Sequence, residues 1–157
     1  MNPRSLLVAA CRLLLAGVFL WACSLKIADL EAFALSVSRY HILPGILVNL
    51  VAIVLPWVEA LSAVALLLPS RALRSGGALL IAGMLAVFSL AISWSLLHGQ
   101  SASCGCFSMR ADAAPSNALN LLRNAALLAA ALVVFFDALF PARSRFPLRR
   151  RLRVPLP

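Results

Sequence analysis

Residues 43–68 read LPGILVNLVAIVLPWVEALSAVALLL, and the only charged side chain among them is Glu59. A helix needs about 20 apolar residues to cross the hydrocarbon of a bilayer, and this stretch is long enough. Lipid offers the backbone no hydrogen-bond partners, so a spanning segment of this kind is expected to be helical throughout. Pro56 lies inside the stretch and is predicted to kink the helix. The stretch therefore predicts a membrane-spanning helix.

Three further apolar stretches of similar length occur in the chain, at about 5–25, 77–97 and 117–140. The composition agrees with a membrane protein, because 63% of the residues are hydrophobic and only 12% are charged. About a quarter of the residues in a typical soluble domain are charged. We therefore predict an all-α integral membrane protein in which residues 1–142 form a bundle of four transmembrane helices.

Basic residues fall unevenly on the two sides of the predicted bundle. One side carries Arg4, Arg71 and Arg74, together with a basic tail over 143–157 that contains RSRFPLRRRLR. Because an excess of Lys and Arg marks the cytoplasmic side of membrane proteins, this side and both termini are predicted to be cytoplasmic. The tail is predicted to face anionic membrane lipid, and nucleic-acid binding is not expected.

The loops on the opposite side, 26–42 and 98–116, are then predicted to be periplasmic, with the spans in the inner membrane of a bacterial cell. The second loop contains SASCGCFS at 101–108, where one glycine separates Cys104 from Cys106. The periplasm is oxidising, so disulfides form and persist there. A disulfide between such close cysteines closes a small strained ring, and strain makes the bond easier to reduce. We predict that the two thiols form a redox pair that exchanges disulfides.

Two other interpretations of the thiol pair remain open. Closely spaced thiolates also bind soft metals such as copper(I) or mercury(II), which would make the protein a metal carrier. The pair could instead fix the loop of a non-catalytic assembly factor. A zinc site is not predicted, because four suitable ligands are not in sight. His98, six residues before Cys104, is a candidate for stabilising a thiolate, and Cys23, near the outer end of the first span, is a candidate third thiol.

Ionisable residues within or at the ends of the spans form a second group of candidates, because charges in lipid usually face the bundle interior and have a partner. At 1.5 Å per residue, Arg12 and Glu59 lie about 10 Å and 15 Å from the cytoplasmic ends of their helices. We therefore predict an ion pair between them, acting as a structural lock or as part of a proton or quinone site. Lys26 is predicted to extend toward water or to pair with Asp29.

The fourth span begins NALNLLRNA, with Asn117, Asn120 and Asn124 at spacings of three and four that place them on one helix face. Asparagines inside lipid commonly hydrogen-bond across helices, so this face is predicted to contact a neighbouring helix. Arg123 lies beside the face and could favour a thiolate in the loop above it. Asp137, near the inner end, is predicted to meet the basic tail.

Several of these segments, in this order, resemble the MauE family of methylamine utilisation, which is related to the DoxX-like membrane proteins. The segments are CRLLLAGVFLWACSLKI at 11–27, YHILPG at 40–45, LPWVEALSAVALLL at 55–68, CGCF at 104–107 and NALNLLRNA at 117–125. The resemblance extends from about residue 4 to residue 140. It departs at Ser108, where glycine often follows CGCF, and at Cys23, where a small residue is more usual.

The resemblance implies a helper in the maturation of methylamine dehydrogenase, whose disulfide-rich small subunit is assembled in the periplasm. Cys104 and Cys106 would be its redox pair. The family's polar intramembrane positions would be Arg12, Lys26, Glu59 and Arg123. Electrons would pass to or from a membrane quinone or a thioredoxin-like periplasmic partner.

Overall fold

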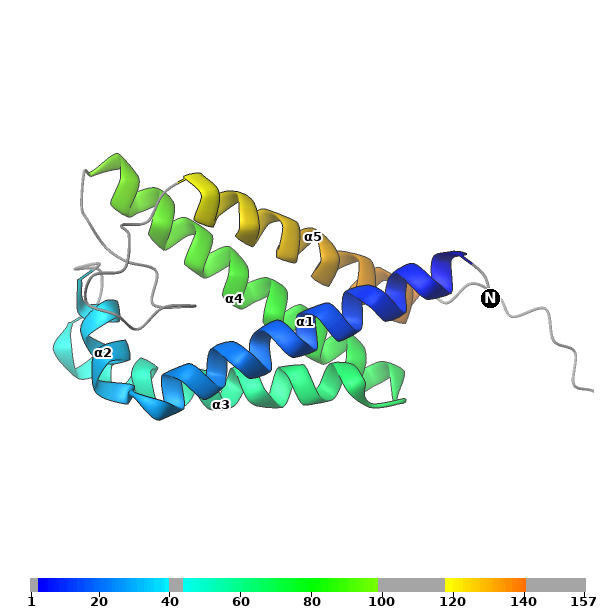
Figure 1. The fold of residues 1–157 in the computed structure, drawn as a ribbon, viewed down its shortest axis with the longest axis horizontal. Coiled ribbons are helices and arrows are strands. Elements are labelled where there is room, and N and C mark those ends of the chain that lie inside the picture. The colour runs from blue at the N-terminus through cyan, green and yellow to red at the C-terminus, as the bar shows by residue number, and fades with distance from the viewer. Residues whose placement is uncertain (1–2, 40–43, 99–117, 141–157) are drawn as a thin grey trace, which may run out of the picture.

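The computed structural model describes residues 3–39, 44–98 and 118–140, which are helical apart from short turns (Figure 1). The helices are α1 (Pro3–Ala28), α2 (Leu30–Ser38), α3 (Gly45–Leu67), α4 (Arg71–Leu97) and α5 (Ala118–Leu139). All but α2 are long and apolar enough to cross a membrane. The predicted all-α membrane fold with four spans is therefore confirmed, and each predicted span corresponds to one of these four helices.

The four long helices form a ring in which α1 and α4 each pack against both α3 and α5 (Figure 1). Arg4, near the start of α1, forms an ion pair of 3.1 Å with Asp137, near the end of α5. Successive spans run in opposite directions, so the start of α1, the end of α3, the start of α4 and the end of α5 share one end of the bundle. We call this the basic end, because Arg4, Arg12, Arg71 and Arg74 lie there.

Asp137 has Arg4 as a partner, and its predicted contact with the basic tail stays a prediction. The basic tail over 143–157 lies outside the described residues, and the ion pair of Asp137 is made with Arg4, which also donates a hydrogen bond to the carbonyl oxygen of Phe140. Both carboxylate and guanidinium are partly exposed, so this pair contributes little to stability, in the range of about 0–1 kcal/mol.

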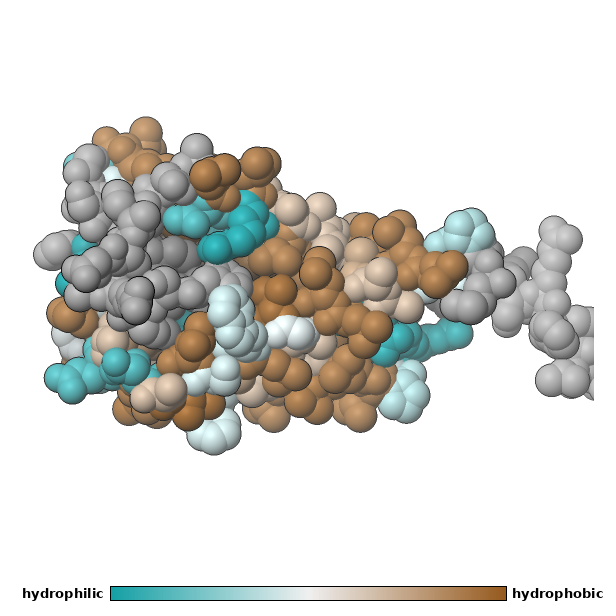
Figure 2. Space-filling view, viewed as in Figure 1, coloured by the Kyte–Doolittle hydropathy of each residue, from teal (hydrophilic) through white to brown (hydrophobic). Residues whose placement is uncertain are grey.

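The core of the bundle is apolar and made from all four long helices. Leu15, Leu66, Ile81 and Ala131 are fully buried in it, one from each helix. The outward faces of the helices carry exposed leucine, isoleucine and valine side chains. Figure 2 shows hydrophobic residues over much of the face in view between the two ends. Soluble monomers rarely expose an apolar surface of this extent, whereas lipid covers it at no cost.

α3 continues without a break through Pro56, whose ring is buried in the bundle. Proline has no N–H group, so the carbonyl oxygen one turn earlier loses its usual helical donor. Neighbouring helices compensate for such a loss inside membranes, which is why proline is tolerated there. The kink expected at this residue stays a prediction.

α2 occupies part of the connection that the sequence was expected to leave as a loop. Asp29 is its N-cap, and the carboxylate accepts a hydrogen bond of 2.9 Å from the backbone N–H of Ala32. The helix buries Phe33, which is 1% exposed, at the end of the bundle opposite the basic end (Figure 1). α2 therefore covers this opposite end and contributes an aromatic ring to its interior.

Replacing Asp29 with Ala is expected to lower the free energy of unfolding by about 1 kcal/mol, because the first turn of α2 loses its side-chain cap. The change should be measured by denaturant titration in detergent micelles, followed by circular dichroism. Asp29→Asn is the matched control, since its side-chain oxygen can still accept the bond. An equal loss in both variants would show that the cap does not stabilise α2.

Candidate functional site

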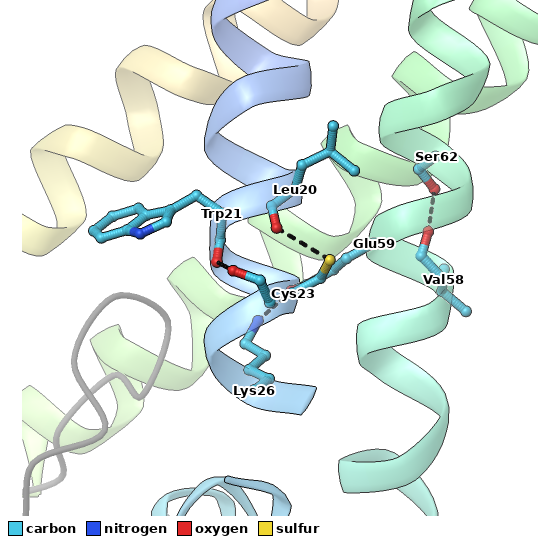
Figure 3. Close-up of polar contacts among 8 residues, drawn as sticks. Leu20, Trp21, Cys23, Lys26, Val58, Glu59 and Ser62 are labelled. Carbon is cyan, nitrogen blue, oxygen red and sulfur yellow. Dashed lines mark hydrogen bonds and ion pairs between the residues drawn. The ribbon is translucent and has the colours of Figure 1, made fainter. Parts of the chain in front are cut away.

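A buried ion pair between Lys26 and Glu59 is the central polar feature of the bundle. Lys26 lies in the last turn of α1 and donates to Oε1 of Glu59, which lies inside α3 (Figure 3). The two side chains are only 1% and 2% exposed. Two opposite charges removed from solvent in this way compensate each other, whereas either one alone would be strongly unfavourable in this core.

The predicted Arg12–Glu59 pair is therefore wrong. Arg12 instead donates hydrogen bonds of 2.9 Å and 3.4 Å to the backbone carbonyl oxygens of Leu66 and Leu67. These carbonyls belong to the last turn of α3, where no helical N–H group is available to bond them. Arg12 therefore supplies the missing hydrogen-bond donors at the C-terminal end of that helix.

The direction of helical side chains explains this choice of partners. Side chains lean toward the N-terminus of their own helix. On α1 that direction is toward the basic end, so Arg12 leans away from Glu59 and Lys26 leans toward the middle of the bundle. Glu59 lies on the antiparallel α3 and leans the opposite way, toward Lys26. The depths of Arg12 and Glu59 along their helix axes do not include this lean of the side chains, so depth alone predicted the wrong partner.

The expectation that Lys26 extends to water or pairs with Asp29 is also wrong. Its ammonium group lies 5.1 Å from the ring centroid of Phe33 and 5.5 Å from that of Phe88. The faces of aromatic rings attract cations, and the attraction is stronger where water is excluded. One carboxylate from α3 and two rings, from α2 and α4, thus surround the charge of Lys26.

A small cavity lies beside the ion pair, at the centre of the four long helices. Its volume is about 20 Å³, which is room for a water molecule. The lining residues are Val18, Phe19, Ala22, Lys26, Glu59, Leu85, Phe88, Asn124 and Leu127. The wall is therefore mostly apolar, with three polar side chains that converge on one space.

Two of these lining residues each have a side-chain atom that is buried without a hydrogen-bond partner among the described residues, Oε2 of Glu59 and Nδ2 of Asn124. The two residues are 1% and 2% exposed. Asn124 was predicted to contact a neighbouring helix, and its burial in the bundle interior agrees with that interpretation. Its position beside the ion pair was not predicted. A clue was available in its spacing from Asn120, which placed both on one face of the last span.

Cys23 lies on α1 three residues before Lys26, close to the ion pair in Figure 3. The side chain is buried, and Sγ donates a hydrogen bond of 3.2 Å to the carbonyl oxygen of Leu20 in the preceding turn. The buried thiol is thus positioned by its own helix. Its part in a thiol relay stays a prediction.

The remaining predicted residues lie apart from the ion pair or outside the described residues. His98 ends α4, where its ring stacks on Trp94 at a centroid distance of 4.1 Å and remains exposed. Arg123 is half-buried on α5, next to Asn124. Cys104 and Cys106 lie in the connection between α4 and α5, outside the described residues, so their predicted chemistry is not tested by the structure.

The fold and this site define a multi-pass membrane protein with a paired charge and a small cavity in its core. The chain belongs to the family of methylamine utilisation protein MauE, whose family model matches residues 4–137. The predicted resemblance is thereby confirmed.

Two curated relatives show the extent of the similarity. The chain is 36% identical over 126 residues to the methylamine utilization protein MauE of Paracoccus denitrificans, a match covering 80% of this chain and 66% of that protein. It is 34% identical over 110 residues to the protein of the same name in Methylophilus methylotrophus, covering 69% of this chain and 57% of that protein. The chain thus spans somewhat less than two thirds of these relatives. No solved structure matches it.

Proposed function

We propose that the protein is an inner-membrane factor that uses Cys104 and Cys106 to assist disulfide formation or maturation of a periplasmic client. The observation that carries the proposal is the pair itself, a Cys-Gly-Cys sequence in the connection between α4 and α5 of a MauE family member. A client consistent with the names of the relatives is the disulfide-rich small subunit of methylamine dehydrogenase.

The distribution of charge supports a periplasmic location for this pair. Arg4, Arg71 and Arg74 belong to the basic end, and excess Lys and Arg favours the cytoplasmic side. The connection that holds the cysteines starts after α4 and leads into α5 at the opposite end of the bundle. The thiols then face the compartment in which disulfides persist.

The proposed chemistry is thiol–disulfide exchange. A thiolate of the client attacks one sulfur of the Cys104–Cys106 disulfide, and the other sulfur leaves as a thiolate. A second client thiol then attacks the mixed disulfide, so the client gains a disulfide and the pair is reduced. Transfer of two electrons and two protons from the reduced pair to a membrane quinone, or exchange with a thioredoxin-like disulfide, restores the starting state. In the opposite direction, the same pair would reduce a client.

Trapping the mixed disulfide tests this proposal. In the Cys104→Ser and Cys106→Ser variants the pair cannot form its own disulfide. The remaining thiolate can still attack a client disulfide, one client sulfur then leaves as a thiolate, and the second loop cysteine that would release the client is missing. At least one variant should therefore accumulate a covalent complex with a client that is visible on non-reducing gels. Cys11→Ser is the matched control and should behave like the parent protein. If neither loop variant captures a partner, exchange is excluded, and tight copper(I) binding by the reduced protein would then favour a metal carrier.

A further inference from the structure

Two buried polar atoms without a hydrogen-bond partner, Oε2 of Glu59 and Nδ2 of Asn124, belong to residues that line the same cavity. Buried polar atoms are nearly always hydrogen-bonded, and one without a partner is costly. We propose that a single water molecule binds in this cavity between the Glu59 carboxylate and the Asn124 amide, and that Glu59 takes up and releases a proton through this water.

The size and chemistry of the cavity fit this ligand. A buried water needs about 10–15 Å³ and two to four polar partners, and the cavity offers about 20 Å³ lined by Lys26, Glu59 and Asn124. A water molecule can donate one hydrogen bond and accept another. It can therefore donate to the Glu59 carboxylate on α3 while it accepts from the Asn124 amide on α5.

The surroundings of Lys26 lower the cost of the extra proton, although an unpaired cation in this core remains unfavourable. When Glu59 binds a proton, an O–H bond forms on its free oxygen, and Lys26 keeps its ammonium charge without a counter-charge. The rings of Phe33 and Phe88, at 5.1 Å and 5.5 Å, still stabilise that cation. The core can therefore alternate between a neutral pair and a single cation.

Few other ionisable groups lie near Glu59. Among the described residues that face it, α1 provides Lys26 and, one turn before it, Cys23, whose thiol is hydrogen-bonded to its own helix. The parts of α4 and α5 that line the cavity are apolar apart from Asn124. In this proposal Glu59 gains and loses the proton, and Lys26 remains charged. The proposal does not depend on the loop cysteines or on their chemistry.

Solid-state NMR of the full chain in lipid bilayers provides the test, because Glu31 and Glu59 are the only two glutamates. A Glu31→Gln protein carrying ¹³C-labelled glutamate leaves the side-chain carboxyl of Glu59 as the observed group. We expect strong magnetisation transfer from water to this carbon, although Glu59 is only 1% exposed. We also expect its chemical shift to move from the carboxylate to the carboxylic acid position as the pH falls.

Asn124→Leu should abolish the water transfer, because it removes the amide and fills the cavity. Asn120→Leu, the same substitution one turn earlier on α5 and outside the lining, should retain it. Absence of water transfer in the parent protein, or equal transfer in the two variants, would overturn the water site. A carboxylate signal at every pH at which the protein stays folded would overturn proton binding. The measurements on the parent are decisive even if Asn124→Leu does not fold.

Discussion

Lys26→Met is expected to destabilise the folded bundle by about 3–5 kcal/mol, because removal of one partner leaves the other as an uncompensated buried charge. Glu59 would remain in a core where its side chain is only 2% exposed. Glu59→Leu should cause a loss of similar size by leaving Lys26 without its carboxylate. The free energy of unfolding should be measured in lipid micelles by titration with a denaturing detergent, following helix content by circular dichroism.

The double variant Lys26→Met, Glu59→Leu should recover most of this loss, since apolar side chains of similar size often replace a buried ion pair without net cost. The matched control is Arg4→Met, which removes an ion pair whose side chains are 49% and 27% exposed and should cost less than about 1 kcal/mol. A double variant as unstable as either single variant would contradict this account. So would a loss in Lys26→Met no larger than that in Arg4→Met.

The fold was predictable from the sequence because lipid imposes a simple requirement. A segment that crosses hydrocarbon must be long, apolar and internally hydrogen-bonded, so hydropathy alone identifies it. The structure extends the first predicted span from 5–25 to Pro3–Ala28 and the third from 77–97 to Arg71–Leu97. Polar residues such as Arg71 and Arg74 lower the hydropathy of these added turns, so hydropathy did not include them in the spans. The turns nevertheless continue the helix at its aqueous end.

α2 could not be found by the same argument, because it is too short to span a membrane. Its signal was local: Asp29 is a favourable N-cap, and Glu31 follows in the first turn, where a negative charge stabilises a helix. The aromatic contact of this helix is made with a residue of another helix. Phe33 reaches Lys26 only after α1, α2 and α3 have packed together, which no spacing in the sequence reveals.

The partner of Glu59 was predicted incorrectly for a related reason. The sequence identified Arg12 and Glu59 as costly charges that needed partners, and Glu59 does have a buried partner. That partner is Lys26, which was expected to extend to water or to pair with Asp29. Which of the two cations lies opposite the carboxylate depends on the direction in which side chains lean along antiparallel helices. That direction places Lys26 in the core and leaves Arg12 to bind carbonyl oxygens at the end of α3.

Gly77→Ala is expected to destabilise the bundle by about 1–3 kcal/mol, because it overpacks a close contact between α3 and α4. A β-carbon at this buried position would lie 2.8 Å from the backbone oxygen of Ser62 and 3.0 Å from the β-carbon of Ala65. A backbone oxygen cannot rotate away as the end of a flexible side chain can, so the two helices must separate. Separation would also loosen the contacts of Ala63 and Leu66 in the core.

Gly76 provides the control, since it is the preceding residue of the same helix and its added β-carbon would meet nothing within 4 Å. Gly76→Ala should cause no loss, and should gain up to about 1 kcal/mol because alanine restricts the unfolded chain and favours helix. Both variants should be compared by the same detergent titration as the Lys26 series. Equal stabilities for the two alanine variants would show that α3 and α4 are not in tight contact at Gly77, and that the ring of helices around Lys26 and Glu59 is packed more loosely there.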